Sequence, residues 1–240
     1  VYGIHDGYLG LCEGKIERLY RRSVSETISK GGTFLGTARL PEFSEEATQD
    51  LAIEELNRYG IDALVVIGGD GTYRGALALS KKGVKVVGIP GTIDNDIAGT
   101  DYTIGFDTAL NTAIEAVDKL RDTSSSHRRC SIVEVMGRNC GAIAVWTGLA
   151  VGAEIVVSKE TGFDLDAIVD NINRAAQVKR HAICIVTEKS TDLNQLAKDI
   201  KARTPFDARV TILGHIQRGG TPTARDRVLA STMGVKAVRG

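Results

Sequence analysis

Short runs of apolar residues recur along this chain, and most of them are followed by a turn that contains glycine. The runs Ala63–Ile67, Val84–Ile89 and Ala182–Val186 are rich in β-branched side chains and contain few polar residues. Runs of this length and composition are typical of strands buried on both faces. Because helical patterns separate them, the chain is predicted to be an α/β protein with a parallel sheet between two layers of helices.

The strands and helices expected from these patterns alternate along most of the chain. The expected strands are Val1–Ile4, Ala63–Ile67, Val84–Ile89, Cys130–Val135, Ile155–Val157, Ala182–Val186 and Val210–Leu213. The expected helices are 44–58, Thr72–Lys81, 107–121, Ala142–Val151, Leu165–Val178, Leu193–Arg203 and one that begins at Ala224. Ser44 is expected to cap the first helix, and no regular element is expected between Ile4 and Pro41.

Glycine placement predicts how the chain divides into domains. The segment Gly99–Gly105 is poor in apolar residues, so we expect a boundary near residue 105. The pair Gly219-Gly220 indicates that the chain then returns to the first domain. We therefore expect two similar lobes, one formed by residues 1–105 with 218–240 and the other by residues 106–217.

Charge and hydropathy exclude several classes of protein. Lysine plus arginine and aspartate plus glutamate both number 30, which argues against a general nucleic-acid binder. No apolar run approaches the roughly 20 residues that cross a bilayer, and the chain does not start with a signal-peptide pattern. The four cysteines, Cys12, Cys130, Cys140 and Cys184, are scattered. Their spacing favours free, buried thiols in a reducing, cytoplasmic setting.

The first turn with chemical potential is Gly68–Thr72, directly after an expected strand. Its structural interpretation is a tight turn in which Thr72 caps the next helix. Glycine N–H groups at a helix N-terminus also form a site for anions. Asp70 suits a phosphate site only if a cation lies between the carboxylate and the phosphate, and Mg²⁺ is a suitable cation.

The second turn, Pro90–Asp96, follows the next expected strand and carries two aspartates. A bare Asp-x-Asp segment is usually a solvated loop. Here it is paired with a second turn that could bind a metal, which favours catalysis. If the segment is extended, Asp94 and Asp96 face the same way and could divide the roles of base and metal ligand.

Further polar residues suit a sugar phosphate, and Glu188, His215 and Arg218 among them follow expected strands. Ligands of parallel sheets bind beyond the carboxyl ends of the strands. Arg129, Arg209, Arg218 and His215 together offer the donors that a phosphate dianion requires, although each arginine alone could be a surface ion pair. Glu188 ends a strand and could accept hydrogen bonds from sugar hydroxyls.

Taken in order, these motifs resemble those of the 6-phosphofructokinases of the bacterial, ATP-dependent type. The segments that carry the resemblance are Gly31–Gly36, Gly68–Thr72, Pro90–Asp96, Asp122–His127, Met136–Arg138 and Leu213–Gly220. The resemblance covers essentially the whole chain and implies a Rossmann-like phosphofructokinase fold. It implies an enzyme of glycolysis that transfers the γ-phosphoryl group of ATP, with Mg²⁺, to the 1-hydroxyl of fructose 6-phosphate.

The resemblance also implies roles for the residues of the reaction centre. Asp94 matches the general base, and Thr92 matches a neighbour that steadies the transferred group. Arg138 matches the arginine that counters charge on that group. Asp70 matches the metal-binding aspartate, with Asp96 beside the same ion. The lobe of residues 1–105 and 218–240 would bind the nucleotide, through Arg39, Leu40, Gly69, Asp70, Gly71, Thr72 and Gly75.

The sugar phosphate would bind in the lobe of residues 106–217 and at its borders. The implied contacts are Thr92, Asp94, Asp96, Arg129, Met136, Gly137, Arg138, Glu188, Arg209, His215 and Arg218. In the family, Arg129 and Arg209 reach the pocket from a neighbouring subunit, so a homotetramer with shared sites is expected.

The resemblance further addresses the phosphoryl donor and regulation. Related enzymes that use pyrophosphate carry aspartate and lysine where this chain has Gly71 and Gly91, so ATP is the expected donor. Positions that bind ADP or phosphoenolpyruvate as effectors between subunits are matched by Arg21, Arg121, Gly152, Glu154 and Lys179. Gln177 replaces a basic residue there, and Lys189 stands where glycine is common.

Three interpretations remain at this point. The first is the kinase described above, and the second is a non-catalytic, nucleotide-binding or regulatory relative, against which Asp94, Asp70 and Arg138 weigh. The third is another kinase with the same glycine turn, such as an NAD or lipid kinase, against which the cluster 209–218 weighs. The family also has a strand and glycine-rich turn ahead of the position of Val1 and a portion beyond 240, so residues 1–240 alone are expected to be poorly active.

Overall fold

The computed structural model describes residues 1–239 and divides the chain into two compact units. Unit 1 contains Val1–Thr92 and the segment that begins at Thr221, and unit 2 is Ile93–Gly220. The divisions therefore lie at 92/93 and 220/221 rather than at the expected 105/106 and 217/218. The first difference has a packing cause, because Ile93 and Tyr102 pack against a hydrophobic cluster of unit 2.

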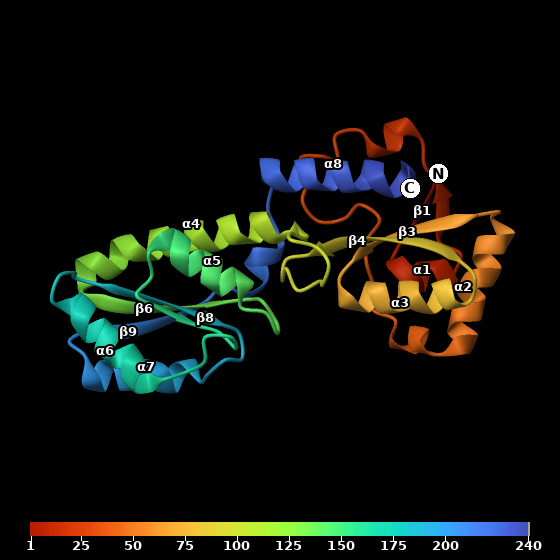
Figure 1. Ribbon diagram of the computed structural model, residues 1–240. Helices are drawn as coiled ribbons and strands as arrows, with labels where there is room; N and C mark the ends of the chain where they lie inside the picture. The colour runs from red at the N-terminus through yellow and green to blue at the C-terminus, as the bar shows by residue number, and fades with distance from the viewer. Residues whose placement is uncertain (240) are drawn as a thin grey trace. The chain divides into compact units, whose positions relative to one another are not determined.

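Unit 1 combines a parallel strand pair with helices and a small antiparallel ribbon (Figure 1). Its strands are β1 (Tyr2–Ile4), β2 (Ile16–Arg18), β3 (Ala63–Gly68) and β4 (Lys85–Thr92). Its α-helices are α1 (Gly7–Cys12), α2 (Glu46–Arg58), α3 (Asp70–Lys81) and α8 (Ala224–Arg239), with 3₁₀ turns η1 (Arg21–Val24) and η2 (Pro41–Ser44). β1 and β2 pair antiparallel, and β3 and β4 pair in parallel.

The strand pair of unit 1 sets the position of both glycine-containing turns. Ile67 lies opposite Ile89 in the ladder, so β3 and β4 end side by side. Leu64 and Val66 of β3 pack in one hydrophobic cluster with Leu56 and Leu79 of the neighbouring helices. The turns that follow β3 and β4 therefore start from neighbouring, anchored strand ends.

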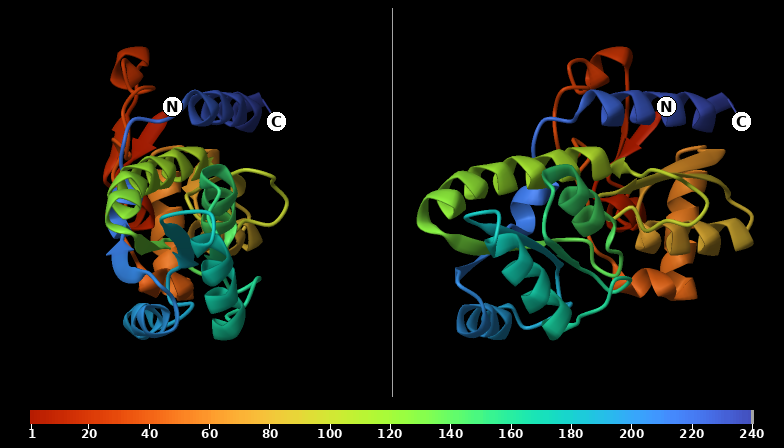
Figure 2. Two further views of the ribbon diagram at one scale, coloured as in Figure 1. Left: turned by 90° about the vertical axis from the view of Figure 1, so that its left-hand side faces the viewer. Right: turned by 60° about the vertical axis from the view of Figure 1, so that its left-hand side comes forward.

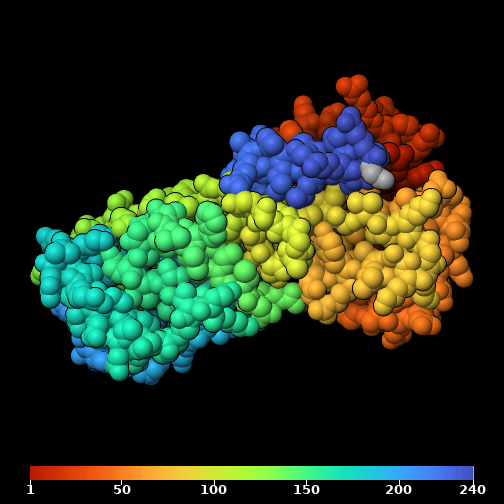
Figure 3. All heavy atoms as spheres, in the orientation of Figure 1, coloured from red at the N-terminus to blue at the C-terminus, as the bar shows by residue number. Residues whose placement is uncertain are grey.

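The prediction that every strand is buried on both faces fails for β3. Its residues alternate between buried and exposed, and Val65 and Ile67 are 42% and 65% exposed. Helix α8 is likewise open along much of its length, as the space-filling view shows (Figure 3), with Val228 66% and Val238 80% exposed. Among the described residues, other elements therefore cover only one face of the apolar strand β3.

Unit 2 is a parallel sheet with helices on both faces. The sheet is formed by β6 (Arg129–Val135), β7 (Ile155–Val157), β8 (Ala182–Thr187) and β9 (Asp207–Ile212), and the two-residue strand β5 (Ile104–Gly105) is not part of it. Its helices are α4 (Phe106–His127), α5 (Ala142–Val151), α6 (Leu165–Ala176) and α7 (Leu193–Arg203), with the 3₁₀ turn η3 (Gly214–Arg218). The sheet order is β7-β8-β6-β9, and every pair in it is parallel.

Two hydrophobic clusters fill the two sides of this sheet. Helices α4 and α5 cover one face, and α6 and α7 cover the other (Figures 1 and 2). All six residues of β8 are buried, and the first five alternate between the two clusters: Cys184 belongs to one, and Ile183 and Ile185 belong to the other. Burying each isoleucine contributes about 1.5–3 kcal/mol. The predicted α/β sheet with two covered faces is confirmed for unit 2.

Local structure departs from the sequence-based expectation in several places. Helix α1 and strand β2 lie in the stretch before Pro41 where no element was expected. Ser44 does not cap α2, because it ends η2 and donates its hydroxyl hydrogen to the carbonyl of Pro41. Helix α4 continues past Arg121 to His127. Cys130 and Cys184 are buried, whereas Cys12 and Cys140 are only half-buried; all four thiols are free.

No helix among the described residues is both long and apolar enough to span a bilayer.

Candidate active site

Three strand ends of unit 2 bring Met136–Arg138, Glu188, His215 and Arg218 to one edge of the sheet, whereas Arg129 and Arg209 lie near the opposite ends of β6 and β9. Val135 of β6 lies opposite Thr187 of β8, and Glu134 lies opposite Ile212 of β9. The segments that follow these strands are Met136–Arg138, Glu188 and the turn η3. Because the strands are parallel and in register, their following segments leave the sheet at one edge. The expectation that these motifs follow strand ends is confirmed here.

The carboxyl of Asp94 has an unusual electrostatic environment within unit 2. Burial raises the pKa of Asp94 above its ordinary value, and the carboxylates of Asp96 and Glu188 raise it further. The guanidinium groups of Arg138 and Arg218 act in the opposite direction. A carboxyl with a raised pKa beside cations is a good acceptor of a proton that leaves a reacting hydroxyl.

The backbone around Asp94 bends, so the condition of an extended segment, under which Asp94 and Asp96 would face the same way, is not met. Asn95 has a φ of 52°, in the left-handed region. Its side chain fixes this turn, because its carbonyl oxygen accepts a hydrogen bond from the Thr103 N–H at 2.9 Å and its amide donates to the Asp101 carbonyl at 3.2 Å. Asp94 and Asp96 therefore do not share a face by strand alternation, and Asn95 is a site residue that sequence reasoning passed over as a spacer.

The loop after β6 is held in shape by its own backbone and by Glu188. Gly137 has a φ of 151°, and a Cβ atom there would collide with the carbonyl of Cys140. Arg138 has a φ of 55°, also in the left-handed region. The Arg138 N–H donates to Glu188 Oε1 at 2.9 Å. Glu188 thus stabilises the strained Arg138 backbone and leaves the Arg138 side chain exposed to solvent.

Gln217 is a residue near the site that sequence reasoning missed. It is 1% exposed, and its Oε1 accepts a hydrogen bond from the Met136 N–H at 2.8 Å. This bond ties the loop after β6 to the turn η3, which carries His215 and Arg218. The sequence offered one signal, since Gln217 lies between the predicted ligands His215 and Arg218. That position does not reveal that the glutamine side chain is buried.

The predicted sugar-phosphate cations lie at the surface of unit 2. His215 and Arg218 are exposed on η3, and Arg209 is exposed on β9. Arg129 is half-buried at the start of β6. Met136 is buried, as is Gly137.

In unit 1 the glycine-containing turn leads into α3, but Thr72 does not cap the helix. The N-cap is Gly69, the helix begins at Asp70, and Thr72 lies in its first turn. The Thr72 carbonyl accepts a hydrogen bond from the Tyr8 hydroxyl at 2.7 Å, and burial raises the pKa of Tyr8 to about 12. Tyr8 therefore remains a protonated donor, and it holds the start of α3 in place.

The helix start leaves its N-terminal N–H groups without a side-chain cap. A Cβ atom on Gly69 would lie 3.6 Å from the Thr92 side chain, so the turn lies directly against the end of β4. Nothing lies within 4 Å of a Cβ atom placed on Gly71. An uncapped helix N-terminus beside open space is suited to bind an anion.

Gly75 and Gly91 are more crowded than Gly71. A Cβ atom on Gly75 would enter the ring of Tyr8, and one on Gly91 would lie 3.1 Å from Ile67. Gly75 is buried, so the structure gives it a packing role against Tyr8. Of the other predicted nucleotide contacts, Arg39 is exposed and Leu40 packs against the core of unit 1.

Asp70 of unit 1 and Asp96 of unit 2 are the residues predicted to hold Mg²⁺. The Asp70 carboxylate is 41% exposed and pairs with Arg74 at 2.7 Å, and Asp96 is exposed. No cluster of three or more histidine, cysteine, aspartate or glutamate side chains suited to a metal occurs within residues 1–239. Mg²⁺ commonly takes one or two carboxylates and completes its shell with phosphate oxygens and water. Each of these aspartates is by itself accessible to a hydrated cation, so the residue types present fit the ion.

The predicted effector residues of unit 2 take part in two sets of polar contacts, one around Glu154 and one around Arg121. Glu154 pairs with Lys179 at 2.6 Å, and its second oxygen accepts from the Ile183 N–H at 2.7 Å. Arg121 donates to the Val151 carbonyl and also contacts His181. Gly152 has a φ of 62°, which only glycine adopts easily. Gln177 is the C-cap of α6, and Arg21 lies on η1 of unit 1.

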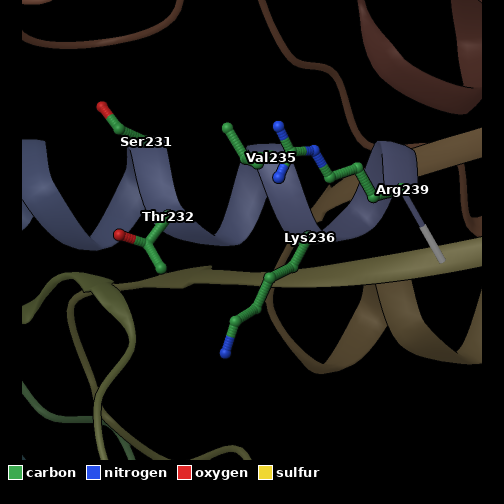
Figure 4. A pocket seen from close by; sticks show the side chains of 5 residues that line it. All are labelled: Ser231, Thr232, Val235, Lys236 and Arg239. Atoms are coloured by element: carbon green, nitrogen blue, oxygen red, sulfur yellow. The ribbon is translucent and has the colours of Figure 1, made fainter.

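A hollow beside α8 contains none of the predicted site residues. Its lining consists of Ser231, Thr232, Val235, Lys236 and Arg239, all from one helix (Figure 4). Thr232 and Lys236 point to one side of α8 in that view, and Ser231 and Val235 to the other. These side chains do not converge on a common point, so the candidate site is assigned to the strand ends.

Comparison with known proteins agrees with this arrangement. The sequence model of the phosphofructokinase family matches residues 1–240. The ATP-dependent 6-phosphofructokinase of Aliivibrio fischeri is 59% identical over 240 residues, which are 100% of this chain and 75% of that protein. Phosphofructokinase from Saccharomyces cerevisiae superposes with a TM-score of 0.90 at 38% identity, over 100% of this chain and 37% of that chain. Pichia pastoris phosphofructokinase in the T-state gives a TM-score of 0.93 at 38% identity, over 100% of this chain and 28% of that chain.

The chain belongs to the phosphofructokinase family. Within that family its sequence is of the ATP-dependent 6-phosphofructokinase type. It spans three quarters of the length of the curated relatives that it matches.

Proposed function

We propose that Asp94 is the general base of a phosphoryl transfer whose other parts are Arg138, Thr92 and the turn that starts α3. The reaction is that of an ATP-dependent 6-phosphofructokinase (EC 2.7.1.11). It converts ATP and fructose 6-phosphate into ADP and fructose 1,6-bisphosphate, a step of glycolysis. The observation that carries the proposal is the environment of the Asp94 carboxyl. Burial and the carboxylates of Asp96 and Glu188 raise its pKa, and two nearby arginines act in the opposite direction.

Asp94 accepts the proton of the sugar's 1-hydroxyl as the oxygen attacks the γ-phosphorus. A raised pKa makes this carboxylate a stronger base than a free aspartate and brings it nearer to the working pH. Arg138 neutralises the charge that spreads over the transferred phosphoryl oxygens. Its exposed side chain and its backbone, fixed by Glu188, support this role.

The nucleotide phosphates bind at the start of α3. The uncapped N–H groups after Gly69 and the open space at Gly71 support this assignment. Asp70 and Asp96 would hold Mg²⁺, and the bound ion would supply charge neutralisation and orientation for the phosphates. Arg39, Leu40, Thr72 and Gly75 complete the nucleotide site.

The sugar phosphate binds at the sheet edge of unit 2. Glu188 accepts hydrogen bonds from the sugar hydroxyls, and Met136 with Gly137 forms the floor of the pocket. His215 and Arg218 on η3 donate to the phosphate. Arg129 and Arg209 donate to the phosphate held by a neighbouring copy, in a homotetramer that works in the cytoplasm. ADP or phosphoenolpyruvate binds between copies at Arg21, Arg121, Gly152, Glu154 and Lys179.

A donor experiment tests the nucleotide assignment. We expect Gly71→Asp to lower ATP-dependent turnover at least tenfold, because its carboxylate would occupy the open space and repel the phosphates. The measurement is the initial rate of fructose 6-phosphate phosphorylation with ATP and, separately, with pyrophosphate. Gly71→Asn, which is equal in size and uncharged, serves as the control for bulk. An unchanged rate with ATP in Gly71→Asp would remove Gly71 from the donor site.

A further inference from the structure

Asp207, which is none of the residues assigned above, is in contact with three cations at the start of β9. Its Oδ2 lies 3.0 Å from Arg209 Nη2 and 3.9 Å from Arg129 Nε, and its Oδ1 lies 3.5 Å from Lys201 Nζ. The backbone dictates part of this geometry, because Arg129 of β6 is the ladder partner of Asp207. Arg209 is two residues further along β9 and so points to the same face as Asp207.

The charge of this group fits a phosphate. Three cations and one carboxylate leave two net positive charges, which matches the charge of a phosphate monoester dianion. The Asp207 side chain is 33% exposed and that of Arg209 is 60% exposed, so an anion can approach from solvent. The charges of Arg129 and Arg209 repel each other, and one shared carboxylate oxygen offsets that repulsion.

The contacts also leave the arginines able to bind. Asp207 approaches Arg129 on the Nε side, and it takes one terminal nitrogen of Arg209. The remaining terminal N–H groups of both guanidinium forks stay available for phosphate oxygens. An arginine held in one orientation loses less side-chain entropy when it binds an anion.

We propose that Asp207 is a positioning residue that holds Arg129 and Arg209 together as one acceptor for the 6-phosphate of the sugar. The proposal rests on the proposed function, which assigns these two arginines to the phosphate. Asp207 does not touch the substrate in this scheme. It acts by fixing the two guanidinium groups before the phosphate arrives.

The test is the steady-state kinetics of Asp207→Asn, Asp207→Glu and the wild type. Asparagine has the same shape without the charge, so we expect the KM for fructose 6-phosphate to rise about three- to tenfold, in line with a partly exposed ion pair. The kcat and the KM for ATP should stay within a factor of two. Asp207→Glu should recover most of the affinity. Asp199→Asn, at a half-buried aspartate of α7 that contacts Gln195, is the matched control.

Each outcome of this test has a defined meaning. An unchanged KM for fructose 6-phosphate in Asp207→Asn would overturn the proposal. A lower KM would also overturn it, because it would mean that Asp207 competes with the phosphate. A fall in kcat with similar rises in the KM for fructose 6-phosphate and the KM for ATP, together with a lowered melting temperature, would show a structural role instead.

Arg209→Ala separates this proposal from the function on which it rests. If Arg209→Ala leaves the KM for fructose 6-phosphate unchanged, the phosphate assignment itself is wrong. If Arg209→Ala raises that KM and Asp207→Asn does not, only the positioning role is wrong. In the Arg209→Ala background, Asp207→Asn should change the KM less than it does in the wild type, because one of its two targets is already gone.

Discussion

Replacement of Asp94 by asparagine should lower kcat by about 10²–10⁴, because the sugar hydroxyl then loses the group that takes its proton. Asparagine keeps the size of the side chain and its capacity for hydrogen bonding. The dissociation constant for fructose 6-phosphate should therefore change little. Stopped-flow or coupled-assay rates at saturating substrates measure the first quantity, and equilibrium binding measures the second.

Asp101→Asn is the matched control for this prediction. Asp101 is an exposed aspartate on the same loop, and its backbone carbonyl accepts a hydrogen bond from Asn95. Its side-chain charge has no assigned role, so kcat should stay within a factor of two. Similar rates for Asp94→Asn and the wild type would exclude Asp94 as the general base.

Removal of the Arg138 side chain has the second largest expected effect. In Arg138→Ala, kcat should fall about 10²–10³, the usual loss when one hydrogen-bond donor to a transition-state oxyanion is deleted. The same change removes a cation that lowers the pKa of Asp94. The pH at which the rate falls on the acid side should therefore move upward.

Arg138→Lys distinguishes charge from geometry in this position. Lysine restores the positive charge but not the planar guanidinium fork, so it should restore the acid-side pH dependence better than it restores kcat. Rates in both variants equal to that of the wild type would contradict the role assigned to Arg138. Arg58→Ala, which removes an exposed arginine from α2 of unit 1, controls for the loss of a surface charge.

The fold of unit 2 was predictable because local and tertiary preferences agree there. The apolar runs that become β6 and β8 are buried on both faces, so their composition and their environment point to the same element. The candidate ligands follow these strands in the sequence, and parallel pairing in register brings the strand ends together. The fold of unit 2 and the meeting of these candidate ligands at one sheet edge therefore followed from the same pattern.

Other features depend on contacts that no local pattern encodes. The left-handed turn at Asn95 is held by Thr103 and Asp101, which lie several residues away. Gln217 looks like any polar residue of a loop until the Met136 N–H is placed beside it. Val65 and Ile67 are exposed because no other described element covers that face of β3, and the sequence of the strand alone does not predict which elements pack against it.

The acid limb of the pH profile tests the role of Asp94 most directly. Asp94 is active when deprotonated, so kcat/KM should fall as the pH drops through its pKa. In Glu188→Gln one carboxylate that raises this pKa is lost, so the midpoint of the acid limb should move to lower pH, even though weaker sugar binding lowers the whole curve. Fructose 6-phosphate titrates identically in both assays and cannot cause a difference. A midpoint that stays in place, or moves to higher pH, would contradict the assignment of Asp94 as the base.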